Sequence, residues 1–167
     1  SLSPTEYFLI ENRHEHKLMN GDSAEGVLIW HIDESVKDEV GNYNGCSGTR
    51  WDCNAVNGNA NHKFIDIEEA DGKDQIDKDK LGDKNDFWKA DCGIGGSCDP
   101  IIFSAASNPN SLGYTSTVND IVVAIASEPT STIGIGLSLL GEVILGDGNT
   151  IEEPIDDVID GNVGIQE

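Results

Sequence analysis

The amino-acid sequence predicts a mainly β protein, built as an antiparallel sheet or a sandwich-like arrangement with long Gly/Asn/Asp-rich loops and few short helices. Apolar, β-branched and aromatic residues gather in runs of strand length. The 167 residues include 19 glycines, a number that indicates many turns. No apolar pattern of helical period continues beyond two turns.

The first expected strands, 7–12 and 27–33, flank the turn residues Asn20-Gly21-Asp22 and predict an antiparallel pair. Tyr7, Phe8 and Trp30 in these strands are expected to be core aromatics. The Gly/Asn-rich stretch 35–62 that follows is expected to be a loop.

Further strands are expected in the second part of the chain. In 63–69, polar residues alternate with Ile65 and Ile67, which predicts a strand with one buried face. The charged segment 71–91 is expected to be a loop with at most one short helix. The remaining expected strands are 101–104, 120–127, 133–140 and 142–145.

Length and composition predict one domain, residues 1–145, followed by an acidic tail or linker, 146–167. Gly146-Asp147-Gly148-Asn149 is a turn signal at the boundary. The tail is acidic with isolated Ile and Val, and such sequence is expected to order only on cations, on a neighbouring chain or along the domain. The N-terminal residues lack a signal-peptide pattern, so a secreted form is expected to be a mature or excised chain.

The charge is strongly acidic, with 31 Asp and Glu against 10 Lys and Arg and a formal net charge of −21. Such a chain repels nucleic acid and anionic membrane surfaces and attracts cations. The most apolar stretch, 132–146, is shorter than the roughly 20 residues that a membrane-spanning helix needs. We therefore expect no nucleic-acid partner and no membrane span.

Four cysteines form two tightly spaced pairs, Cys46 with Cys53 and Cys92 with Cys98. Four cysteines allow three pairings, and we favour the two local ones because short loops cost the least entropy to close. Disulfides indicate a secreted or cell-surface, extracytoplasmic location. A zinc site with four thiolates is the alternative, although its ligands normally stand closer in sequence.

The segment 71–86 is the strongest candidate for a metal site. Short carboxylates and one amide crowd into it, and Ca²⁺ prefers six to eight such oxygen ligands. The alternative is a solvated acidic loop, whose charge the neighbouring lysines soften. The candidate ligands are Asp71, Asp74, Asp77, Asp79, Asp83, Asn85 and Asp86. A second, weaker candidate in the tail comprises Asp147, Asn149, Asp156, Asp157, Asp160 and Asn162.

Five segments stand in an order that resembles the immune inhibitor A family of secreted zinc metallopeptidases, in the part that follows the zinc-binding helix. The resemblance spans about residues 5–140. The segments are 6–13 (EYFLIENR), 26–34 (GVLIWHIDE), 69–72 (EADG), 82–86 (GDKND), and a last one with Phe103, Pro109-Asn110-Ser111, Tyr114 and 120–126.

The family's His-Glu-x-x-His helix is absent from these 167 residues, because no two histidines stand four apart. The resemblance therefore implies a non-catalytic C-terminal portion, with Zn²⁺ belonging only to the intact peptidase. The implied partner is the upstream catalytic region or its cleaved product. His14 and His16 are expected in a solvated turn after a strand, and the alternative is a strand pair that binds zinc with a third ligand.

His31 and Asp33 stand two apart in an expected strand and so share a face. They either approach the active-site side of an intact peptidase, or His31 is a buried, hydrogen-bonded residue beside Trp30.

Two other classes of function stay open. The chain is alternatively a structural or interaction subunit of a cell-surface assembly, self-assembling through its tail. It is otherwise a carbohydrate- or peptide-binding module that uses Trp51 or Trp88, both expected to be partly exposed or packed on a disulfide.

Overall fold

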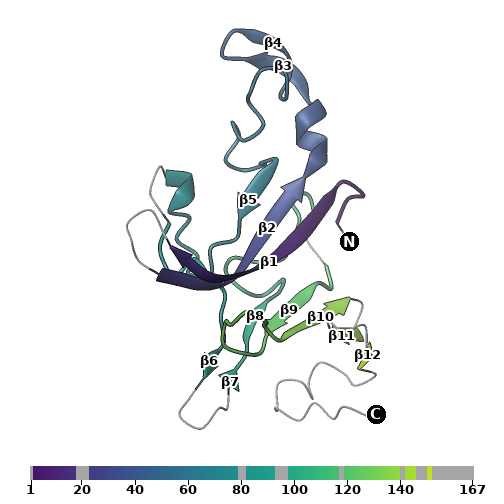
Figure 1. Ribbon diagram of the computed structural model, residues 1–167. Helices are drawn as coiled ribbons and strands as arrows, with labels where there is room; N and C mark the ends of the chain where they lie inside the picture. The colour runs from purple at the N-terminus through teal and green to yellow at the C-terminus, as the bar shows by residue number, and fades with distance from the viewer. Residues whose placement is uncertain are drawn as a thin grey trace.

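The computed structural model describes residues 2–17, 23–78, 82–92, 98–116, 119–139, 142–145 and 150–151. The protein is mainly β and antiparallel, as the sequence predicts (Figure 1). Its first sheet has the order β1-β2-β5, with β1 at Glu6–Lys17, β2 at Ser23–Asp33 and β5 at Ile65–Ile67.

Strands β1 and β2 form the predicted antiparallel pair, with a register from Glu6 opposite Asp33 to Lys17 opposite Ser23. The strands are longer than expected, and the register shifts once, between Arg13 and His16. The expectation that Tyr7 lies in the core is wrong, since Tyr7 is 41% exposed. Side chains alternate along a strand, and it is Phe8 and Ile10 that pack on the core.

The second sheet has the order β12-β11-β10-β9-β8, and all its pairs are antiparallel. The expected strands of this region all form, each slightly shorter than or equal to its predicted range. A last short strand lies beyond residue 145, in the stretch predicted as the acidic tail. The strands are β8 at Ile101–Phe103, β9 at Val122–Ile125, β10 at Ile135–Leu139, β11 at Glu142–Leu145 and β12 at Thr150–Ile151.

The main core lies between the two sheets, because its buried residues come from both. Val27 and Ile29 of β2 meet Phe103 of β8 and two residues of β9, and all are fully or almost fully buried. Trp88 joins this cluster from the loop that follows β5, with its ring centroid 5.3 Å from that of Phe103. This apolar contact holds the first sheet against the second.

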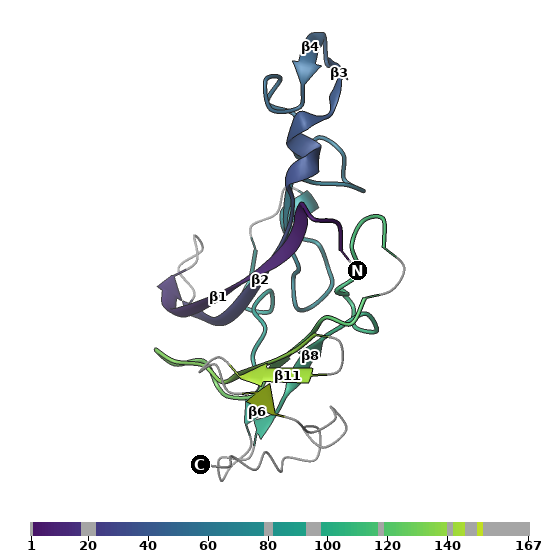
Figure 2. The ribbon, with the colours of Figure 1, turned by 90° about the vertical axis from the view of Figure 1, so that its right-hand side faces the viewer.

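An arm formed by residues 34–53 rises from the end of β2, away from the second sheet (Figures 1 and 2). It consists of the 3₁₀ helix η1 at Glu34–Asp38 and the hairpin of β3 at Val40–Tyr43 and β4 at Cys46–Thr49. The prediction of a plain loop over 35–62 is therefore wrong for this part. Asn44 and Gly45 both have positive φ, as a two-residue hairpin turn requires.

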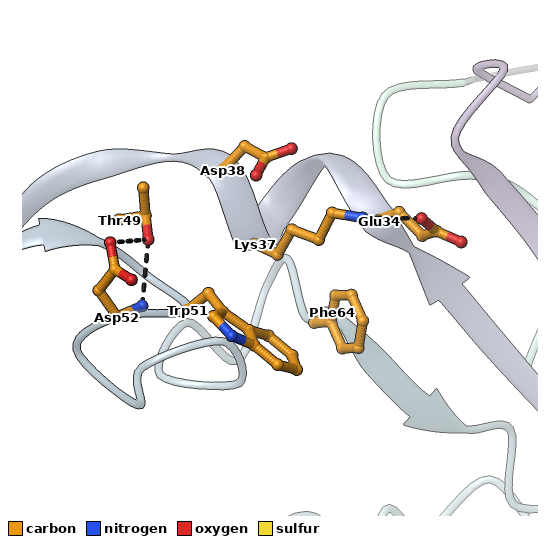
Figure 3. A pocket seen from close by; sticks show the side chains of 7 residues that line it. All are labelled: Glu34, Lys37, Asp38, Thr49, Trp51, Asp52 and Phe64. Atoms are coloured by element: carbon orange, nitrogen blue, oxygen red, sulfur yellow. Dashed lines mark hydrogen bonds and ion pairs between the residues drawn. The ribbon is translucent and has the colours of Figure 1, made fainter.

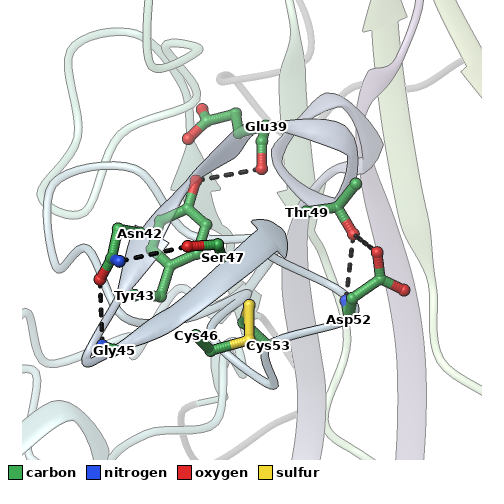
Figure 4. The surroundings of a disulfide bond; sticks show 9 residues. All are labelled: Glu39, Asn42, Tyr43, Gly45, Cys46, Ser47, Thr49, Asp52 and Cys53. Carbon is green, nitrogen blue, oxygen red and sulfur yellow. Dashed lines mark hydrogen bonds between the residues drawn. A yellow bond between two sulfur atoms is a disulfide. The ribbon is translucent and has the colours of Figure 1, made fainter.

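A disulfide between Cys46 and Cys53 closes the arm, as the spacing predicts (Figure 4). Within the arm, the Tyr43 hydroxyl donates to the carbonyl oxygen of Glu39 at 3.0 Å. The second predicted pair lies at the short strands β6, Asp91–Cys92, and β7, Cys98–Asp99, whose register places Cys92 opposite Cys98. Cys92 is disulfide-bonded, and its pairing with Cys98 stays a prediction because the Cys98 side chain lies outside the described residues.

Helical structure in the described ranges is limited to η1 and the 3₁₀ turn η2 at Ile76–Lys78. None of the helices found there has the length and apolar character needed to cross a membrane.

Candidate functional site

Backbone contacts close the loop between β5 and β6 and bring its two ends together. Trp88 and Val27 form an antiparallel bridge, in which each N–H donates to the other's carbonyl, at 2.9 and 2.8 Å. The Trp88 indole donates to the carbonyl of Glu68 at 2.7 Å, and the N–H of Ala70 donates to the carbonyl of Asp86 at 3.1 Å. Because Trp88 is fixed in the core, Asp86 is held beside the residues that follow β5.

Three carboxylates converge inside this loop. Glu69, Asp71 and Asp86 each offer one oxygen, and these oxygens lie within 4.8 Å of one another. Glu69 is 2% exposed and Asp86 is 3% exposed. The two oxygens of Glu69 accept hydrogen bonds from the N–H groups of Gln75 and Ile76, at 2.6 and 2.8 Å. Each oxygen keeps a second lone pair, so the three residues form an all-oxygen ligand set.

Asp86 has the least complete hydrogen bonding of the three carboxylates. Its Oδ2 accepts a hydrogen bond from the N–H of Asp83, whereas its Oδ1 is buried without a hydrogen-bond partner. Gly82 makes this position possible, because a Cβ at residue 82 would collide with Oδ2. Burial, reinforced by the charges of Glu69, Asp83 and Asp71, raises the pKa of Asp86 to about 6.

Lys73, a lysine close to the cluster in sequence, does not enter it. Lys73 donates from Nζ to Oδ2 of Asp71 at 2.7 Å, but its side chain is 61% exposed. It therefore screens the rim of the cluster, and no lysine or arginine of the described residues is found beside the buried oxygens of Glu69 and Asp86. A bound cation would coordinate these oxygens and offset the repulsion between them.

The structure brings together only part of the predicted ligand set. Asp71 and Asp86 converge, whereas Asp83 accepts hydrogen bonds from Gln75 and from the N–H of Asn85. Asp74, with φ of 49°, and Asn85 are exposed. The side chain of Asp77, all of Asp79 and the second candidate set in the tail lie outside the described residues, namely Asp147, Asn149, Asp156, Asp157, Asp160 and Asn162.

Glu69 was missed as a ligand by sequence reasoning. Its signal was present in the segment 69–72, where a carboxylate ends the predicted strand 63–69 and stands shortly before Gly72. A glutamate at the end of a strand, close to a turn, is positioned to point into the loop that follows.

A second buried cluster surrounds His31. Its Nε2 lies 3.0 Å from Oε1 of Glu6, and its Nδ1 lies 3.1 Å from Oε1 of Glu68. The side chains of His31 and Glu6 are 4% and 1% exposed. The ring stacks on Tyr114 with centroids 4.4 Å apart and also contacts Phe8. Both ring nitrogens face carboxylates, an arrangement that suits the imidazolium form, which donates from both.

Asp33 takes part in a neighbouring network with His62, which sequence reasoning did not select. His62 Nε2 lies 2.8 Å from Oδ2 of Asp33, and its ring packs 4.6 Å from that of Tyr114. The Oδ1 of Asp33 accepts hydrogen bonds from the N–H and hydroxyl of Ser35, at 2.9 and 2.6 Å, and caps η1.

The two networks around the histidines shift the pKa values of His31 and Asp33 in opposite directions, and in each the charged form is favoured. Burial disfavours the imidazolium of His31, but the hydrogen bonds and charges of Glu68 and then Glu6 outweigh it and raise the pKa of His31. Burial also opposes ionisation of Asp33, but hydrogen bonds from Ser35 and His62 outweigh it and lower the pKa of Asp33. His31 is therefore the buried, hydrogen-bonded residue of the second interpretation.

His14 and His16 lie within β1, so the expectation of a turn is wrong. His14 is exposed and its Nδ1 lies 3.3 Å from Glu25 Oε2 on the neighbouring strand. In the part of the chain that the structure describes, no histidine joins the carboxylates of the acidic loop.

The two loop tryptophans differ. Trp88 is 2% exposed, so the expectation of partial exposure is wrong for it, and it packs on Phe103 in the core. Trp51 is 64% exposed and its ring packs edge-on against Phe64, with centroids 6.2 Å apart.

Comparisons of the chain with family models, with curated proteins and with solved structures gave no match.

Proposed function

We propose that this chain is a non-catalytic, calcium-stabilised β unit of an extracytoplasmic protein, with Glu69, Asp71 and Asp86 as protein ligands of the ion. One observation carries the proposal: Asp86 is almost fully buried, and its Oδ1 has no hydrogen-bond partner. Native proteins rarely leave a buried polar atom unpaired unless an ion or a water completes it.

The chemistry of the ligand set favours calcium over zinc. All three side chains supply hard oxygen atoms, and no imidazole or thiolate among the described residues approaches them. Structural zinc sites use cysteine and histidine, whereas calcium accepts carboxylates at several distances and completes its shell with carbonyls and water. The surrounding loop has Gly72 and Asp74 in the left-handed region, which lets the backbone turn sharply around the carboxylates.

The motif order extends this proposal to the whole chain. The carboxylates Glu69, Asp71 and Asp86 lie in two of the segments that resemble the immune inhibitor A family. We therefore propose that the unit corresponds to the C-terminal portion of such a secreted peptidase, acting beside an upstream catalytic region. The disulfide between Cys46 and Cys53 is compatible with an extracytoplasmic location.

Calcium should raise the free energy of unfolding by about 2.7 kcal/mol when its concentration is a hundred times its dissociation constant. Urea unfolding in EDTA and in excess calcium measures this gain. Asp86→Asn should abolish it, whereas Asp120→Asn, an exposed carboxylate beside the second sheet, should keep it. Equal stability of the native chain in both conditions, or a gain reproduced by sodium chloride of the same ionic strength, would contradict the proposal.

We expect no endopeptidase activity from this chain alone, because a zincin needs two histidines four apart on a helix and a glutamate as general base. A fluorogenic peptide assay with added zinc checks this expectation. Turnover that a chelator stops, and that His14→Ala, a change at an exposed histidine, removes, would show that the chain carries its own catalytic site.

A further inference from the structure

A pocket opens where the arm meets the first sheet, and none of its lining residues belongs to the carboxylate cluster of the acidic loop. Its volume is about 610 Å³, within the range of pockets that hold small ligands. The exposed ring of Trp51 and the ring of Phe64 form one side (Figure 3). The aliphatic part of Lys37 extends above them toward Glu34.

The position of Trp51 follows from the local structure and not from chance exposure of a loop. The N–H of Trp51 donates to the carbonyl of Lys37 at 3.1 Å, and the carbonyl of Trp51 accepts from the N–H of Asn54 at 3.1 Å. The disulfide from Cys46 to Cys53 closes the chain directly after it. The indole is therefore presented on a constrained backbone while most of its surface stays in solvent.

The rim of the pocket is acidic. Glu34, Asp38 and Asp52 line it, and Lys37 is the one basic residue among its lining side chains. Lys37 is already engaged, because its Nζ donates to Oε2 of Glu34 at 2.9 Å. Asp52 is held in place, because its Oδ2 accepts a hydrogen bond from the Thr49 hydroxyl at 2.7 Å. The formal charge of the lining is thus −2, from three carboxylates and one ammonium.

We propose that this pocket binds the cationic side chain, arginine or lysine, of a partner polypeptide. An aromatic face attracts a cation through its quadrupole, and tryptophan does so best. Carboxylates beside that face add direct charge complementarity, and an arginine fork can donate to them. Two features of the pocket, its exposed indole and its acidic rim, therefore favour the same class of ligand.

Lys37 indicates how such a ligand competes. Its ammonium forms an ion pair with Glu34, so an incoming cation must share the Glu34 carboxylate or displace Lys37 from it. Removing Lys37 should then tighten binding, whereas a site for a neutral ligand would lose a polar contact. This difference in sign separates the proposal from a carbohydrate site built on the same tryptophan.

The experiment is an NMR titration of the isotope-labelled chain with N-acetyl-arginine amide, in parallel with N-acetyl-citrulline amide, which has nearly the same shape without the charge. The indole signal of Trp51, assigned by its loss in Trp51→Phe, should shift saturably with the arginine compound only. Trp51→Leu should weaken binding about two- to fivefold, followed through the backbone amide of Asp52. Lys37→Gln should tighten binding up to about fivefold.

Matched controls separate the pocket from the general acidity of the chain. Asp38→Asn combined with Asp52→Asn should weaken binding, whereas Asp120→Asn with Glu128→Gln, two exposed carboxylates beside β9, should leave it unchanged. Asp86→Asn should also leave it unchanged, so that this proposal and the calcium proposal fail independently. Equal shifts with the citrulline amide, or no saturable shift with the arginine compound, would overturn the proposal. Equal weakening by the Asp120 and Glu128 pair would do the same. A methyl glucoside is titrated in parallel, and a response to it alone would also overturn the proposal.

Discussion

The protein buries carboxylates in two places and neutralises them differently. Around His31, two glutamates flank a basic ring that the chain itself supplies, with nitrogen-to-oxygen distances of 3.0 and 3.1 Å. In the acidic loop, Glu69, Asp71 and Asp86 converge with no basic group from the described part of the loop between them, and Lys73 remains at the rim. The first cluster is complete as a protein structure, whereas the second requires a proton or a cation from solution.

The difference teaches that burial of acidic groups has two physical solutions with different consequences. An internal counter-charge is part of the chain, so the fold depends on it whatever cations the medium holds. An external cation is present only when its concentration permits, so the same fold becomes responsive to the medium. We expect the His31 cluster to determine whether the chain folds and the acidic loop to determine how stable it is in a given medium.

The largest effect should follow from removing the internal counter-charge. His31→Leu introduces an apolar side chain that leaves Glu6 and Glu68 without their basic partner, and it should cost about 3–5 kcal/mol of unfolding free energy. Chemical denaturation measures the loss, and calcium should not restore it. His14→Ala, an exposed histidine on the same sheet, should cost less than about 1 kcal/mol. A cost for His31→Leu as small as that of the control would refute the role of the ring as counter-charge.

A substitution in the acidic loop should stabilise the chain in one medium and destabilise it in another. Asp86→Asn removes a buried charge but keeps an oxygen that can accept from the N–H of Asp83, so in EDTA it should stabilise the chain, on the order of 1–2 kcal/mol after allowance for solvent screening. In excess calcium it should be less stable than the native chain. Thermal unfolding in the two media gives the comparison, and destabilisation in both would mean that Asp86 has a purely structural role.

The smallest effects are two losses of stability with rising pH, in separate windows. The fold favours the protonated form of Asp86. Its contribution to stability is therefore complete below pH 3.8, the pKa of this side chain in the unfolded state, and is lost as pH rises through about 6. The contribution of charged His31 is complete below 6.5 and is lost as pH rises through its higher folded pKa. Urea midpoints over about pH 4 to 8 should show both losses in EDTA, and calcium should remove only the lower one. If calcium removed both, the two clusters would not be separate.

The fold class and most of the strands were predictable, because alternation of apolar and polar residues is a local property. The hairpin of the arm was also within reach, since Asn44-Gly45 is a strong two-residue turn signal that the overall Gly/Asn-rich composition concealed. Tyr7 was assigned to the core wrongly, although Phe8 does pack there, because a strand pattern fixes alternation but not which face meets the core.

The candidate site was predictable only in part, for a physical reason. Crowded aspartates indicated a cation site, but which of them converge depends on the bridge between Trp88 and Val27, which are far apart in the chain. The same limit applies to His31, whose partner Glu68 is 37 residues away. Contacts of this range are set by the pairing of β2 with β5 and with the loop that follows it, and they leave no local pattern.

The carboxylate of Glu6 has a further consequence for how the molecule opens. Besides facing His31, its Oε1 accepts a hydrogen bond from the N–H of Tyr114, across 108 residues at 2.7 Å. One side chain in the first strand thus connects a loop that precedes β9 to the sheet of β1 and β2. Neither part can separate without exposing this carboxylate and its donor together, so local fraying there is suppressed. The amide hydrogen of Tyr114 should therefore exchange with solvent only when the whole domain unfolds, and its exchange rate would report the global equilibrium.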